Sequence, residues 1–189
     1  MKKLLLISIL ILPLYGCIAT TALVVGATAG GAIVYDKRSF KTMQEDKHAS
    51  RLANYWVSND KKLKGRSHIS VSVFDNVALL VGQAQTAELK ERAEKIVKHI
   101  KNIKRIYNAI AVAGSTTELQ RASDTWITSK VRTSLLAKRG LKSNDIKVVT
   151  EAGVVYLMGN ISRDQADLAT DAARHVSGVV KVVKVFEYT

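Results

Sequence analysis

The segment Ile69-Ser-Val-Ser-Val-Phe-Asp-Asn-Val-Ala-Leu-Leu-Val-Gly82 recurs without a gap, 77 positions further on, as Ile146-Lys-Val-Val-Thr-Glu-Ala-Gly-Val-Val-Tyr-Leu-Met-Gly159. In each copy an apolar run leads to a two-residue turn, Asp75-Asn76 in the first and Ala152-Gly153 in the second, and a second apolar run follows. This pattern predicts a β-hairpin in each copy. Gly82 and Gly159 are expected to end the return strands, where glycine allows a positive φ or a close backbone approach.

A helix and a third strand are predicted after each hairpin. Thr86 is a candidate N-cap of the first helix, and Ser162-Arg-Asp-Gln165 has the form of a capping box for the second. The β-branched runs 103–112 and 179–186 then indicate one more strand in each copy, parallel to its neighbour after a right-handed crossover. The expected buried faces of the two helices are Leu89, Ala93, Ile96, Val97 and Ile100, and Ala166, Ala169, Ala173 and Val176.

Each hairpin is also preceded by a predicted helix, near 49–57 in the first copy and over 125–137 in the second. Apolar residues recur in the second of these at i, i+4 and i+8, as in a helix packed on a core: Ile127, Val131 and Leu135. Ser123 or Asp124 is its expected N-cap, and Gly140 stops it. We therefore predict an α+β fold of two tandem α-β-β-α-β units, each with two helices packed on a three-stranded mixed sheet.

Residues 1–16 have the organisation of a secretory signal peptide. A charged start is followed by an apolar run, Leu4 to Leu14, that is too short to cross a bilayer as a helix. Gly16-Cys17 resembles the bacterial lipobox, in which the cysteine is acylated, and Cys17 is the only cysteine in the chain. The expected organisation is a signal peptide over 1–16, lipidated Cys17 and a tether over 17–44, a first domain over 45–112, a linker over 113–119 and a second domain over 120–189.

The chain is strongly basic, with 29 Lys and Arg against 16 Asp and Glu. Such an excess suggests an anionic partner. Ile18 follows Cys17 at the place where an aspartate would resemble the inner-membrane retention signal, so we expect an outer-membrane lipid anchor that faces the periplasm. In that compartment anionic phospholipid is the expected partner and nucleic acid is not.

No linear motif indicates catalysis. The four histidines, His48, His68, His99 and His175, are scattered without the i, i+4 pairing of metal ligands. A nucleophile elbow, a P-loop and a dinucleotide fingerprint are also absent from the sequence. We expect a protein that is not an enzyme, with no catalytic residue, no metal site and no cofactor, although a site assembled by folding stays open.

Two tandem α-β-β-α-β units behind a lipobox resemble the BON domains of the dual-BON outer-membrane lipoproteins, over about residues 45–186. The most specific motifs are Asp124-Thr-Trp-Ile-Thr-Ser-Lys-Val-Arg132, Tyr156-Leu-Met-Gly159 and Ala87-Glu-Leu89. The resemblance implies that the second domain binds anionic phospholipid, such as phosphatidylglycerol or cardiolipin, and supports envelope integrity. Carried over by position, it implies these phospholipid contacts: Trp126, Ile127, Lys130, Val131, Arg132 and Ser134.

Trp126 has two interpretations. Its position relative to Ile127 places it at the edge of the buried stripe beside Lys130, and the residues alone favour a core role. The resemblance favours membrane contact, for which an indole among cations is suited. A rival function of another class is a scaffold for protein partners, such as the outer-membrane β-barrel assembly machinery, with the aromatic residues as hot spots.

Overall fold

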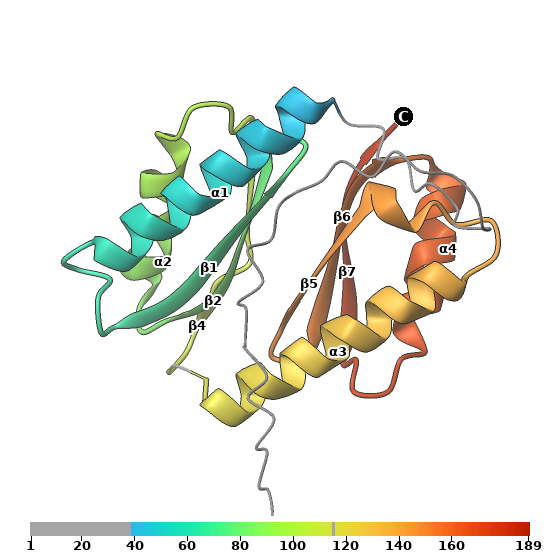
Figure 1. Ribbon diagram of the computed structural model, residues 1–189. Helices are drawn as coiled ribbons and strands as arrows, with labels where there is room; N and C mark the ends of the chain where they lie inside the picture. The colour runs from blue at the N-terminus through green and yellow to red at the C-terminus, as the bar shows by residue number, and fades with distance from the viewer. Residues whose placement is uncertain (1–38, 115) are drawn as a thin grey trace, which may run out of the picture. The chain divides into compact units, whose positions relative to one another are not determined.

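The computed structural model describes residues 39–114 and 116–189, which belong to one compact unit. The predicted signal peptide, lipidated Cys17 and most of the tether lie outside the described residues. Two copies of one arrangement follow each other (Figure 1), so the predicted α+β fold of tandem units is confirmed. The elements are α1 (Phe40–Asn59), β1 (Ser67–Phe74), β2 (Val77–Ala84), α2 (Ala87–Lys98), β3 (Arg105–Asn108) and β4 (Ala111–Val112), then α3 (Glu118–Ala137), the short 3-10 helix η1 (Ser143–Asp145), β5 (Ile146–Glu151), β6 (Val154–Ile161), α4 (Arg163–Arg174) and β7 (Lys181–Tyr188).

The central strand of each sheet is the second strand of its hairpin. The strand orders are β1-β2-β3, with β4 also paired to β2, and β5-β6-β7. Both hairpins are antiparallel and the returning strands are parallel to the central ones, as predicted. The strand predicted over 103–112 is divided in two, because Ile110 turns into the core of the first domain between β3 and β4. Gly82 and Gly159 lie inside β2 and β6, so the prediction that they end these strands was wrong.

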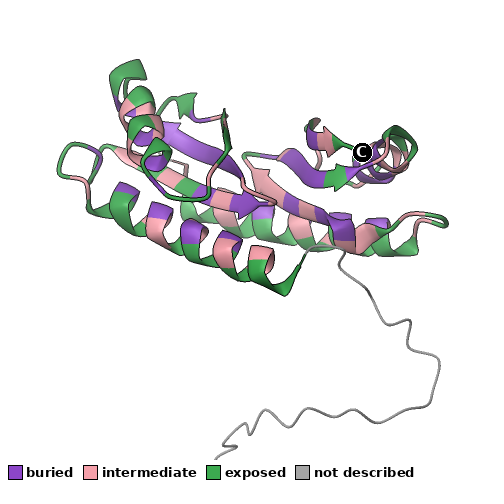
Figure 2. Ribbon diagram, turned by 90° about the horizontal axis from the view of Figure 1, so that it is seen from above, coloured by how far each residue is buried: buried purple, intermediate pink, exposed green. Residues whose placement is uncertain are grey.

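Each domain has its own core between its two helices and one face of its sheet. The buried residues recur along one side of α1 and of α3 (purple in Figure 2). The predicted faces of α2 and α4 are confirmed, with Ile96 and Val176 only partly buried. Alternate residues of the central strands complete these cores, namely Ala78 and Leu80 in β2 and Val155 and Leu157 in β6.

The other faces of the two sheets pack against each other. This third apolar cluster contains Phe74, Val77, Leu79, Val81, Tyr156, Met158 and Val185. β2 and β6 are therefore buried on both faces, which explains their nearly continuous apolar sequence. Polar contacts add to the interface: Gln83 Nε2 donates to Glu151 Oε1 at 2.6 Å, and Arg105 pairs with Glu187 at 2.6 Å. The composition of the linker contains no sign of this interface.

Both long helices begin earlier than predicted. The N-cap of α1 is Ser39, whose side chain accepts a hydrogen bond from Thr42 N, and the N-cap of α3 is Thr117, whose side chain accepts one from Gln120 N. Ser123 and Asp124 thus lie inside α3, and the prediction that one of them is its N-cap was wrong. An acid before an apolar stripe suggested a cap, but this acid faces the sheet.

The second helix of each domain begins as predicted. Thr86 accepts from Leu89 N, and Ser162 accepts from Gln165 N. The side chain of Gln165, however, does not close a capping box. It accepts from Lys142 N at 2.8 Å and donates to Gly140 O at 2.8 Å, so it holds the loop that follows α3 against α4.

Candidate membrane-binding surface

α3 has a core side and a solvent side that differ sharply. Ile127, Val131 and Leu135 are at most 4% exposed, as their spacing predicts. On the solvent side Leu119 is 83% exposed, and Trp126 and Leu136 are each 66% exposed. Trp126 therefore does not lie at the edge of the core. The buried stripe is centred near Val131, so Ile127 already forms one margin and Trp126 lies about 100° beyond it.

Asp124 attaches α3 to the hairpin of its own domain. Its buried carboxylate accepts from Ala152 N at 2.8 Å and from Gly153 N at 2.9 Å, both in the β5–β6 turn. Asp46 of α1 does the same in the first domain, accepting from Asp75 N at 2.7 Å and Asn76 N at 3.0 Å. The sequence carried a signal for this element, because one acid precedes the buried stripe at the same i−3 spacing in both domains.

Several polar side chains of α3 and its C-cap form hydrogen bonds or ion pairs within the second domain. Lys130 Nζ donates to Ser177 O in the loop between α4 and β7. Ser134 Oγ donates to Ala172 O of α4 at 2.9 Å. Lys138 pairs with Asp171 at 2.8 Å, and this hydrogen bond is the main reason that the pKa of the Asp171 carboxyl is lowered. Arg132, by contrast, is exposed.

The six predicted phospholipid contacts therefore divide into two sets. Trp126, Lys130 and Arg132 reach the surface of the domain. Ile127 and Val131 face the core and Ser134 binds α4, so these three shape and hold the helix in this structure. Phospholipid contact by any of the six stays a prediction.

The loop between α4 and β7 extends the solvent side of α3. A Cβ on Gly178 would lie 3.1 Å from Ile127 Cγ1, and Val180 N donates to Gly153 O at 2.9 Å, so the loop lies against both the helix and the hairpin turn. Val180 is 79% exposed at this place. Sequence reasoning missed it. We call Leu119, Trp126, Leu136 and Val180, with Lys130 beside them, the α3 outer surface.

Nothing in residues 39–114 and 116–189 suggests a metal centre, since no three His, Cys, Asp or Glu side chains are grouped as ligands there. Over the same part of the chain, no helix combines the length and the apolar character needed to cross a membrane.

Comparison with known proteins identifies the family. The BON domain family matches residues 50–114 and 123–189. The chain is 30% identical over 175 residues to the Outer membrane lipoprotein DolP of Haemophilus influenzae, covering 93% of this chain and 90% of that protein. It is 37% identical over 153 residues to the 21 kDa hemolysin of Actinobacillus pleuropneumoniae, covering 81% and 79%. The expected outer-membrane location is confirmed by the first of these relatives, and the chain belongs to the BON-domain family as a dual-BON outer-membrane lipoprotein of the DolP type.

Proposed function

We propose that this protein is a non-catalytic envelope protein that binds anionic phospholipid through α3 of its second BON domain and thereby helps to maintain the envelope. The exposure of Trp126, at 66%, carries the proposal. The core of the domain is complete without this indole, so its packing gives no reason for a large apolar ring in water. An indole beside Lys130 suits the boundary between lipid headgroups and acyl chains.

Charge and attachment both support this function. The chain has 29 Lys and Arg against 16 Asp and Glu, and a basic residue near an anionic bilayer contributes roughly 1 kcal/mol. A lipid anchor at Cys17 would keep the domain beside the membrane, where a modest affinity acts at a high effective concentration. Strong binding by the isolated domain is therefore not required.

Vesicle binding by the chain that begins at residue 18 tests the proposal. This form lacks Cys17 but keeps all described residues. We expect it to bind vesicles that contain phosphatidylglycerol or cardiolipin, to bind neutral phosphatidylcholine vesicles poorly, and to dissociate as salt screens the charges. The Trp126→Ala variant should bind about tenfold more weakly, which corresponds to about 1.4 kcal/mol.

The matched control is Trp56→Ala. Trp56 is the other tryptophan, lies on α1 of the first domain and is 39% exposed. It should leave vesicle affinity unchanged. Binding that ignores the anionic lipid content, or that survives Trp126→Ala intact, contradicts phospholipid recognition by α3.

A second candidate function is a scaffold for outer-membrane assembly proteins, and the first domain favours it. Tyr55 is 64% exposed and lines a hollow of about 420 Å³ together with Trp56, Ile96 and His99. Aromatic side chains around a shallow hollow are typical of protein-binding hot spots. A photo-crosslinker at Tyr55 should then capture a protein in cells and one at Trp126 should capture lipid; a protein adduct at Trp126 that lipid does not protect against would favour the scaffold.

A further inference from the structure

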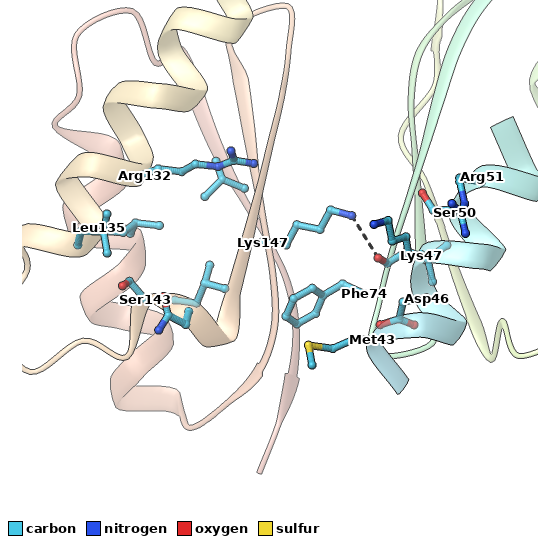
Figure 3. A pocket seen from close by; sticks show the side chains of 15 residues that line it. Met43, Asp46, Lys47, Ser50, Arg51, Phe74, Arg132, Leu135, Ser143 and Lys147 are labelled. Carbon is cyan, nitrogen blue, oxygen red and sulfur yellow. Dashed lines mark hydrogen bonds between the residues drawn. The ribbon is translucent and has the colours of Figure 1, made fainter. Parts of the chain in front are cut away.

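A groove of about 700 Å³ lies between the two domains and shares only Leu136 with the α3 outer surface (Figure 3). One wall comes from α1 and the end of β1, and the other comes from α3, η1 and β5. Among the six predicted phospholipid contacts, Arg132 alone lines it. The groove exists because the two sheets pack face to face and bring the edge strands β1 and β5 to its two sides.

The groove is lined by four cations from both walls: Lys47, Arg51, Arg132 and Lys147. Figure 3 shows Lys47 and Lys147 extending into the space between the walls. Lys147 Nζ donates to Val73 O of the first domain at 3.2 Å. The one acid in the lining, Asp46, is buried and already accepts from the amides of Asp75 and Asn76. The lining therefore attracts an anion.

Most of the remaining lining is apolar, and Ser50, Ser143 and Asn144 are its uncharged polar members. The apolar residues are Met43, Val73, Phe74, Leu135, Leu136, Ile146 and Val148. Its volume is in the range of pockets that hold small molecules. Cations beside an apolar wall match a ligand that has an anionic group and a hydrocarbon chain in one molecule.

An acidic peptide that adds a strand to β1 fits this groove less well. The Val71 carbonyl of this edge strand already accepts from Ser50 Oγ at 2.9 Å and Asn54 Nδ2 at 2.7 Å, and Val71 N donates to Asn54 Oδ1 at 2.9 Å. Strand addition needs such backbone groups to be unpaired. A lipid needs none of them.

We infer that this groove binds one molecule of anionic phospholipid. Its phosphate lies among Lys47, Arg51, Arg132 and Lys147, and part of an acyl chain lies along Met43, Phe74 and Leu136. The inference rests on the proposed affinity for anionic phospholipid and adds a second site, which takes a single lipid molecule while the α3 outer surface contacts the bilayer.

Titration of the chain that begins at residue 18 with dihexanoyl phosphatidylglycerol, kept below its micelle concentration, tests this site. This form retains the two domain cores and the interface between them. We expect saturable one-to-one binding by calorimetry and amide shifts centred on α1 and β5. Dihexanoyl phosphatidylcholine, which is neutral, and glycerol phosphate, which has no acyl chain, should each bind at least about tenfold more weakly.

The variant that removes the site is Lys47→Glu with Arg51→Glu, because both side chains are exposed on α1 and their reversal disturbs no core. It should weaken binding of the dissolved lipid at least about tenfold. The control with the same net charge is Lys95→Glu with Lys98→Glu on α2, outside the groove, and it should bind normally. Equal weakening in both variants would mean diffuse attraction and would overturn the site.

The α3 outer surface and the groove can be tested independently of each other. Trp126→Ala should bind vesicles about tenfold more weakly and bind the dissolved lipid normally. The Lys47 and Arg51 variant should bind vesicles like its charge-matched control. If dissolved lipid does not saturate the groove while vesicles still bind through Trp126, the groove assignment is wrong and the proposed function stands. If vesicles no longer depend on Trp126 while the groove still binds lipid, the proposed role of α3 fails. Tighter binding of a hexaglutamate peptide than of the lipid would assign the groove to a protein partner.

Discussion

The two BON domains have one topology but differ in which of their two helices carries the large buried side chains. The large buried side chains are on the second helix of the first domain and on the first helix of the second domain: Leu89 and Val97 against Ile127 and Val131. The small ones are placed the other way round: Ala49 and Ala53 against Ala166 and Ala169. The fold therefore depends on the total filling of the space beside each sheet more than on which helix supplies it.

The solvent sides of α1 and α3 differ in a second way. When Asp46 is matched with Asp124, Trp126 corresponds to His48 and Arg132 to Asn54. The side chain of Asn54 forms hydrogen bonds with the backbone of Val71 in β1, whereas Arg132 lines the groove. The same helix position therefore holds a side chain that fixes α1 to its sheet in the first domain and a side chain that lines the groove in the second.

The largest expected difference concerns the glycines in the central strands. Gly82 has a φ of +113°, and a Cβ there would lie 2.0 Å from His68 O; on Gly159 it would lie 2.6 Å from Asp145 O, without a positive φ. We expect Gly82→Ala to lower the free energy of unfolding by about 3 kcal/mol or more and Gly159→Ala by about 1–3 kcal/mol. Urea unfolding measures both; equal losses would show that backbone conformation adds nothing to the close approach.

Val131 of α3 and Ala53 of α1 occupy matched positions, and the exchange of core volume between the helices predicts how substitutions there change stability. Val131→Ala should leave a cavity under α3 and cost about 2–3 kcal/mol. Ala53→Val should overpack α1 against its sheet and cost about 1–3 kcal/mol. Both are measured by thermal and urea unfolding. If Ala53→Val were neutral, α1 would have spare room and the proposed exchange of volume between helices would not hold.

An ion pair joins the end of the first helix to the second helix in each domain. The first helix supplies the acid Asp60 in the first domain and the base Lys138 in the second. We therefore expect the two pairs to contribute differently to stability at low pH. Arg92 donates to Asp60 at 2.7 Å and 2.6 Å, and mainly this bond lowers the pKa of Asp60 from 3.8 to about 2. Because the folded-state pKa is the lower one, the contribution is complete above about pH 4 and is lost as the pH falls toward 2. Because Arg92 is partly exposed, solvent screens the pair and this contribution is small.

Removing Arg92 should therefore flatten the acid dependence of stability. In Arg92→Ala, unfolding at pH 7 should become easier and the loss between about pH 4 and 2 should shrink. Lys138→Ala, which breaks the more exposed pair with Asp171, should change this slope less. Chemical denaturation at a series of pH values tests both variants, and a larger change in Lys138→Ala would reverse our ranking of the pairs.

The smallest effect is spectroscopic and leaves stability unchanged. Trp56→Phe leaves Trp126 as the fluorophore, and Trp126→Phe leaves Trp56. On adding phosphatidylglycerol vesicles, the emission of Trp126 should shift to the blue as the indole leaves water, and that of Trp56 should stay in place. A shift confined to Trp56 would assign membrane contact to the first domain.

Local patterns predicted what each domain does within itself. Thr86 and Ser162 were identified as caps and Leu89 and Ala166 as core residues because these roles depend on neighbours a few positions away. The interface between the sheets was not predicted, since β2 and β6 are buried on both faces and show no alternation. The run Val77-Ala-Leu-Leu-Val81 was a usable signal, because a strand with one solvated face rarely lacks polar residues.

The candidate site shows the same limit. The spacing of Ile127 and Val131 predicts burial, and this conflicts with the phospholipid contact that the family resemblance implies for them. Ser134 binds Ala172 across two packed helices, which no linear pattern encodes. The groove needs both domains in place, so its four cations are separated along the sequence and could not be grouped from it.

The face shared by the two sheets also bears on how the protein is made. The first domain emerges first during synthesis and export, and its apolar residues Phe74, Leu79 and Val81 have no cover until β6 folds. Until then they are a hazard for aggregation. The short connection between the domains keeps the covering sheet at a high local concentration, which shortens the time for which this apolar face of the first domain is exposed.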